Sequence, residues 1–197
     1  MKTASYSRYV VAVIAIMIGL MFHATASAYS YAAAGKEPLI EGREAILTAL
    51  SRGDYDSINS AVVNLKEEFD YLLTDHNVDL YTPMKSAIDV KNEQQIIAVI
   101  DQALVEEIIR RLEGAEKNLA DYQVAKVLVV KSKLFLDLLL PKLSDNNRDV
   151  ATTAIQGVLA SIGNPGVFGV GQAPADPEQF ARHKAQLLLA LDEMKLH

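Results

Sequence analysis

The chain has 197 residues, with 19 Lys and Arg against 25 Asp and Glu, a net charge of −6 at pH 7, and no cysteine. An acidic chain is poorly suited to nucleic acid or anionic lipid, whose negative charge repels it. The lack of cysteine excludes disulfides, a thiolate metal site, a cysteine nucleophile and covalently attached c-type haem.

The N-terminus carries the features of an export signal. Lys2 and Arg8 give it positive charge, an apolar run follows at 9–22 (YVVAVIAIMIGLMF), and 26–28 (ASA) is a small-residue cleavage motif. We expect cleavage at this motif, with Ala34 as a second cleavage position. An uncleaved anchor is the alternative interpretation, and the shortness of the apolar run speaks against it.

Removal of residues 1–28 leaves a flexible leader at 29–37 and a single domain at 38–197. A domain of this size can bury a substantial core without disulfides. The expected signal, the lack of cysteine and the lack of an Asn-x-Ser/Thr site after residue 28 favour an exported bacterial protein, periplasmic or secreted.

Apolar residues of the predicted domain recur every three to four positions, which is typical of amphipathic helices. Gly53 and Asp54 suit the turn between the first two helices, and Asn92 suits the start of a long one. The predicted helices, in chain order, span 38–51, 55–74, 83–90, 93–118, 121–140, 149–161 and 178–196.

The helix at 121–140 is predicted to be the most enclosed, because 124–140 is almost continuously apolar. Its charges are too many for a membrane span, so no stable span is expected after signal cleavage. The helix at 93–118 is predicted to be an ordinary amphipathic helix. Its charged group, at 106–107 and 110–111 (EE and RR), is predicted to face solvent.

These elements predict an all-α fold, an up-and-down bundle of four to five long helices with one or two short ones. The architecture is similar to that of several bacterial periplasmic modules that bind metals or accompany transport and respiratory systems. Such a likeness of architecture assigns no site residue.

An acidic cluster near the end of the second predicted helix could bind a divalent cation such as iron, zinc or manganese, because carboxylates and imidazole are suitable ligands. The alternative is a solvated acidic rim, since no Glu-x-x-His pair of the di-iron type is present. The candidate metal ligands are Glu67, Glu68, Asp75, His76 and Asp79.

The only long Gly/Pro-rich segment, at 163–177, has no preceding strand and no G-K-[ST] motif, so it does not predict a phosphate site. It could cover one end of the bundle or dock a partner. The candidate docking residues in it are Gly166, Phe168, Gly169 and Gly171.

No catalytic motif is found, and the sequence predicts a protein that is not an enzyme. We expect an exported binding or accessory module that docks a protein partner or a small ligand. The alternative is a divalent-metal-binding protein that uses the acidic cluster around His76.

Overall fold

Short polar side chains set the helix starts by accepting hydrogen bonds from the first free backbone N–H groups. Asp54 Oδ1 accepts from Ser57 N at 3.0 Å, and Asn92 Oδ1 accepts from Gln95 N at 3.1 Å. Gly53 has a φ of 63°, a left-handed conformation that glycine adopts without strain. Both helix starts, and the turn at Gly53 that precedes the first of them, are therefore as the sequence predicts.

The computed structural model describes residues 37–166 and 171–196, and in these ranges it is all-helical, without strands. The predicted all-α class is confirmed, whereas the predicted export signal lies outside the described residues. The elements are α2 (Pro38–Leu50), α3 (Tyr55–Asn64), α4 (Lys66–His76), α5 (Tyr81–Asp89), α6 (Glu93–Lys117), α7 (Tyr122–Leu139), η2 (Leu140–Lys142), α8 (Asp145–Ser161), α9 (Pro177–Leu191) and η3 (Asp192–Met194).

The second predicted helix is in fact two helices, because the chain bends at Leu65 between α3 and α4. Leu65 N donates to both Ala61 O and Val62 O, each at 3.1 Å. The Leu65 side chain packs on Gly42 of α2 so closely that a Cβ there would lie 2.5 Å from Leu65 Cδ1. Apolar spacing continues through the bend, so periodicity alone could not reveal it.

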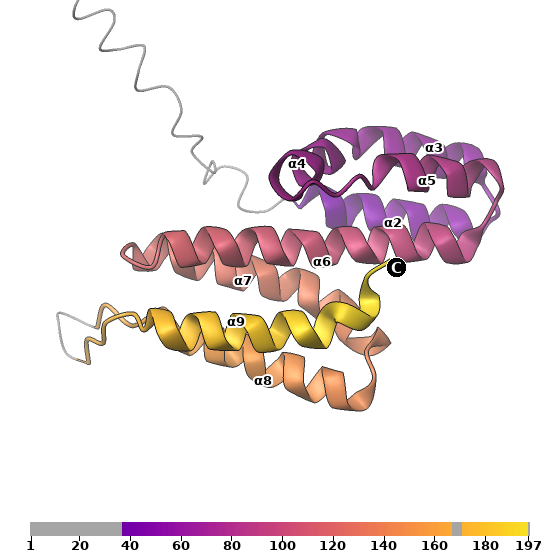
Figure 1. Ribbon diagram of the computed structural model, residues 1–197. Helices are drawn as coiled ribbons and strands as arrows, with labels where there is room; N and C mark the ends of the chain where they lie inside the picture. Colours follow the sequence, from indigo (N-terminus) through magenta and orange to yellow (C-terminus); the bar gives the residue numbers. More distant parts are fainter. Residues whose placement is uncertain (1–36, 167–170, 197) are drawn as a thin grey trace, which may run out of the picture. The chain divides into compact units, whose positions relative to one another are not determined.

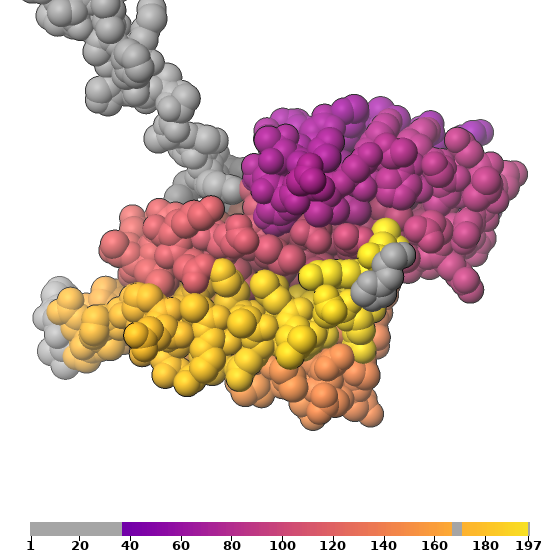
Figure 2. Space-filling model, viewed as in Figure 1, coloured from indigo at the N-terminus to yellow at the C-terminus, as the bar shows by residue number. Residues whose placement is uncertain are grey.

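The long helix α6 lies at the centre of the compact unit that begins at Pro38. Helices α2, α4 and α5 contact it, and so do α7 and α9 (Figure 1). Figure 2 shows the N-terminal helices in purple and α9 in yellow on opposite sides of α6. From Val99 to Ile108 every residue of α6 is buried. The prediction that 121–140 is the most enclosed helix is therefore wrong, and α6 has that role.

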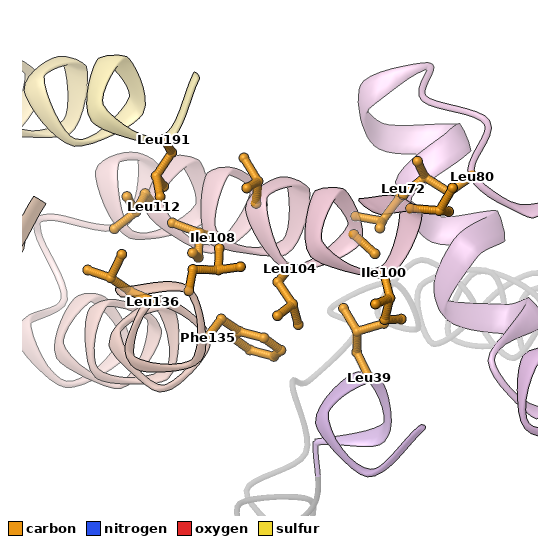
Figure 3. Packing of buried hydrophobic residues seen from close by; sticks show 14 of the residues in the cluster. Leu39, Leu72, Leu80, Ile100, Leu104, Ile108, Leu112, Phe135, Leu136 and Leu191 are labelled. Carbon is orange, nitrogen blue, oxygen red and sulfur yellow. The ribbon is translucent and has the colours of Figure 1, made fainter. Parts of the chain in front are cut away.

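The hydrophobic core extends along both sides of α6 (Figure 3). Leu39 and Leu72 reach it from the N-terminal helices, and Phe135 and Leu191 reach it from α7 and α9. Each fully buried side chain of this size contributes about 1.5–3 kcal/mol to folding. A shared core of this kind makes the N-terminal helices and the α7–α9 layer depend on the same central helix.

Polar residues of α6 also hold the C-terminal half of the fold. Asp101, buried on α6, accepts a hydrogen bond from Lys142 Nζ in η2 at 2.7 Å. Gln102 Oε1 accepts from the backbone N–H of Leu196 at 3.1 Å. None of the helices in 37–166 and 171–196 combines the length and apolar character needed to cross a bilayer.

Candidate functional site

The five predicted metal ligands lie on α4 and in the turn after it, and three of them, Glu67, His76 and Asp79, have different hydrogen-bond partners. Glu67 Oε1 accepts a hydrogen bond from Tyr71 Oη at 2.9 Å, and Asp79 Oδ1 accepts from Thr82 N at 3.1 Å. Asp75 is exposed. Across the residues described here, no three His, Cys, Asp or Glu side chains are grouped to hold a metal ion.

His76, the central member of that predicted group, faces the core of the protein. Its Nδ1 lies 3.0 Å from Oε2 of Glu106 on α6, within hydrogen-bond distance. This contact joins positions 30 residues apart in the sequence and fixes the end of α4 against α6. The imidazole is therefore paired with a single carboxylate from a helix that the metal prediction did not include.

The neighbouring charges of α6 form the rest of a buried ionic cluster, which we define as Glu68, His76, Glu106, Glu107, Arg110 and Arg111. Glu107 Oε1 accepts from Arg110 Nη2 and from Arg111 Nε, both at 2.7 Å. Arg110 Nε also donates to Glu107 Oε2 at 2.7 Å. The four α6 members, Glu106, Glu107, Arg110 and Arg111, were predicted to face solvent, and that prediction is wrong because each has a charged partner in the cluster.

Two carboxylates of the cluster have pKa values displaced in opposite directions. Burial acts to raise the pKa of Glu107, but the hydrogen bonds and charges of Arg110 and Arg111 outweigh it, and the pKa is lowered. Burial raises the pKa of half-buried Glu68, and the negative charge of Glu107 raises it further. The cluster therefore holds one firmly ionised carboxylate and one that protonates more easily.

Arg111 connects the buried ionic cluster to α7. The guanidinium carbon lies 4.8 Å from the ring centroid of Phe135 on α7, a cation–π contact. Arg111 thus bridges an anionic group and an aromatic ring on two helices. We interpret the cluster as a device that positions α4, α6 and α7 relative to one another.

An open groove of about 440 Å³ lies between α2 and α3, away from the cluster. Pro38, Gly42, Ser57 and Asn64 are among the residues that line it, and Glu41 is the one carboxylate among the lining residues that the structure describes.

The most distinctive surface belongs to α7, whose outer face is apolar as well as its core face. Val124, Val130 and Leu134 are 40%, 42% and 47% exposed. At about 100° per residue they share one side of the helix with half-buried Val127, Lys131 and Leu138. We call these six residues the outer face of α7.

The outer face has a recognisable spacing. Its positions 124, 127, 131, 134 and 138 alternate in steps of three and four, the a/d pattern of a helix that packs against another helix. The core face of α7 uses different residues, among them Ala125, Leu128 and Phe135. Sequence reasoning assigned the whole apolar run to the core and missed this face, although the three–four spacing was visible.

Lysines border the outer face. Lys126 is exposed and lies over the Tyr122 ring at 5.4 Å. Lys133 pairs with Asp137 at 2.7 Å, as the sequence predicts from their spacing. Together with Lys131 this gives α7 three lysines beside one aspartate around its outer face, in a chain with net negative charge.

The predicted docking loop is described only in part, because Phe168 and Gly169 lie outside the described residues. Gly166 and Gly171 both have positive φ, at 73° and 74°. The loop is closed at its base by paired backbone hydrogen bonds between Asn164 and Ala173, at 2.8 and 2.9 Å. This base fixes where the loop begins and ends, and the docking role of the loop stays a prediction.

Comparison of the chain with protein-family models, with curated proteins and with solved structures found no significant match.

Proposed function

We propose that this protein is an exported, non-enzymatic docking module that binds a helical segment of a partner protein on the outer face of α7. The observation that carries the proposal is the second apolar stripe of α7, formed by Val124, Val130 and Leu134 with half-buried neighbours. A helix that is buried on one side and apolar on the other presents a surface suited to another amphipathic helix.

The length of the stripe supports the same role. From Val124 to Leu138 it covers about 21 Å along the helix axis, which is enough for two heptads of a partner helix. The valine and leucine side chains at the a and d positions would pack into holes between side chains of that partner. Export is supported by the apolar run at 9–22 with its cleavage motif, which also makes the proposed partner an exported protein.

The proposal is tested with a synthetic amphipathic helical peptide of about three heptads, leucine at a and d, labelled for fluorescence anisotropy and titrated with the full chain. The test variant is Leu134→Gln, because glutamine keeps helix propensity and removes the apolar contact. The matched control is Leu189→Gln on α9, where the leucine is 76% exposed and lies on a different helix.

We expect the wild type and the Leu189→Gln protein to bind with the same affinity. Leu134→Gln is expected to weaken binding about tenfold, the loss typical of a central apolar contact. Equal binding by all three proteins would show that the peptide binds elsewhere and would refute the proposal.

A further inference from the structure

The groove of about 440 Å³ between α2 and α3 is elongated, and its two ends can be identified. The two helices pack against each other and are joined by a short turn, so they run antiparallel. Gly42 of α2 lies against Leu65 of α3. The end of the groove at Glu41 is therefore also the end at Asn64, and Ser57 lies toward the other end. From Ser57 to Asn64 the helix rises about 10 Å.

The two serine hydroxyls that line the groove can only accept further hydrogen bonds. Ser57 Oγ donates to the carboxylate oxygen Oδ2 of Asp54 at 2.6 Å. Ser60 Oγ donates to the backbone carbonyl of Asp56 at 2.9 Å. Each hydroxyl has one hydrogen, so both oxygens keep only lone pairs for a ligand, and Pro38 has no N–H to add. The serine end of the groove therefore favours a ligand that donates hydrogen bonds.

The charge at the other end favours the same kind of ligand. Glu41 is exposed, and it forms no ion pair with any residue in the described ranges 37–166 and 171–196. No Lys, Arg or His is found among the described residues that line the groove. Asn64 beside Glu41 adds an amide oxygen that can accept a hydrogen bond. A cationic nitrogen can form a charge-assisted hydrogen bond to the carboxylate at this end.

The wall between the two polar ends is apolar. Ala45 on α2 and Ala61 on α3 line it, and their side chains are single methyl groups that leave room for a narrow chain. A bare metal ion fits this arrangement poorly, because it needs several oxygen ligands around one point. The oxygen atoms here are instead spread along the length of the groove. They suit an extended ligand with a donor group at each end.

We propose that the groove between α2 and α3 binds a linear aliphatic diamine. One ammonium group pairs with Glu41, and the methylene chain lies over Ala45 and Ala61. The second ammonium group donates to Ser57 and Ser60, since an ammonium has three hydrogens and can serve both oxygens at once. This site is separate from the outer face of α7, so the proposal does not depend on the docking function.

The experiment titrates the full chain with cadaverine, a linear diamine, and follows alanine methyl resonances by NMR. Ala45 and Ala61 report on the groove, and buried Ala151 of α8 is the internal control. The test variant is Glu41→Gln, which keeps the size of the side chain and removes its charge. The matched control is Glu178→Gln, because Glu178 is also an exposed glutamate in the first turn of a helix that begins with proline.

For the wild type and Glu178→Gln we expect saturable shifts of the groove methyl groups with the same dissociation constant. Glu41→Gln should weaken cadaverine binding about tenfold, because the charge-assisted hydrogen bond is lost. Ala45→Leu, which fills the groove without a change of charge, should weaken binding by a similar factor. Aminopentanol, with a hydroxyl in place of the second ammonium, should bind more weakly than cadaverine, and pentanediol should give no saturable shift.

Equal binding of cadaverine to the wild type and Glu41→Gln would overturn the proposal, as would the absence of a saturable shift at the groove methyl groups. An equal loss in Glu178→Gln would show that cadaverine responds to net charge alone. Equal binding of aminopentanol and cadaverine would show that the second ammonium is not recognised. Leu134→Gln on α7 should bind cadaverine as the wild type does, so the failure of one proposal can be distinguished from the failure of the other.

Discussion

The imidazole of His76 on α4 and the carboxylate of Glu106 on α6 form a pair in which both side chains are more than nine-tenths buried, 8% and 7% exposed. A buried pair of this kind is costly to break, because removal of one member leaves the other without its partner away from water. The pair ties α4 to the central helix and extends the polar cluster of α6 into the N-terminal half of the fold.

Removal of the imidazole should therefore destabilise the protein. We expect His76→Ala to lower the free energy of unfolding by about 3 kcal/mol in urea denaturation, because Glu106 stays buried without its hydrogen bond. The double variant His76→Leu with Glu106→Met should recover most of this loss, since it removes both polar groups together. A single variant as stable as the wild type would show that the contact contributes nothing to folding.

The Glu107 carboxylate should make the free energy of unfolding fall as the pH is lowered. Its pKa in the folded protein is lower than the ordinary value of 4.5, so its stabilising contribution is present above pH 4.5 and is lost as the pH falls through the folded value. We expect Glu107→Gln to lower the free energy of unfolding by about 3 kcal/mol at pH 7, because both arginines lose their anion. The difference from the wild type should shrink on acidification, and a difference independent of pH would contradict this account.

Glu68 should affect the pH dependence of the free energy of unfolding in the opposite direction. Burial and then the charge of Glu107 raise its pKa in the folded protein, so ionised Glu68 is a cost that is absent below pH 4.5 and develops as the pH rises through the folded value. We expect Glu68→Gln to stabilise the protein at pH 7, by less than about 1 kcal/mol because the half-exposed side chain is screened by water. Thermal melts at pH 4 and pH 7 test this, and loss of stability at pH 7 would show that Glu68 has a favourable partner.

Helices α8 and α9 meet closely at Gly157 and His183. A Cβ at position 157 would lie 2.5 Å from the His183 ring, so the substitution requires the ring or the helix to move. Gly→Ala within a helix normally stabilises by about 1 kcal/mol, but here we expect Gly157→Ala to destabilise by about 1–3 kcal/mol. The substitution His183→Ala removes the ring, so in a His183→Ala protein we expect Gly157→Ala to be stabilising. If Gly157→Ala destabilises the protein with and without His183, the clash is not with the His183 ring.

Much of the fold could be predicted from local signals. Caps such as Asp54 and Asn92 act within three residues of their own position, so they are readable from the sequence, and they start α3 and α6 as predicted. The helical spacing of apolar residues likewise gives the all-α class. These signals do not depend on which helices become neighbours.

The central helix was misassigned because its polar partners are remote in sequence. Asp101, Glu106 and Glu107 make α6 look solvent-facing, yet Asp101 is paired with Lys142 and Glu106 with His76. A charged side chain can be buried when it is paired, and the pairing is made by tertiary contacts that periodicity does not contain. The proposed metal ligands were likewise chosen by proximity in sequence, and the structure gives Glu67, His76 and Asp79 different hydrogen-bond partners.

For α7 the prediction failed in the opposite direction, because it overestimated how much of the helix is buried. An almost continuous apolar run predicts burial on most sides, but α6 and the other packed helices cover only the side that includes Leu128 and Phe135. The run contains two apolar stripes on different sides of the helix, and the sequence alone does not identify the stripe that packs against the other helices. The stripe left exposed, with its three–four spacing, is the basis of the docking proposal.

The most direct test of that proposal is methyl NMR of the full chain titrated with the amphipathic helical peptide that has leucine at its a and d positions. We predict that the methyl resonances of Val124, Val130 and Leu134 shift in a saturable manner. Those of Leu73 and Leu189, exposed leucines on α4 and α9, should stay unchanged and serve as internal controls. Shifts centred on the control leucines, or no saturable shift on α7, would contradict the account.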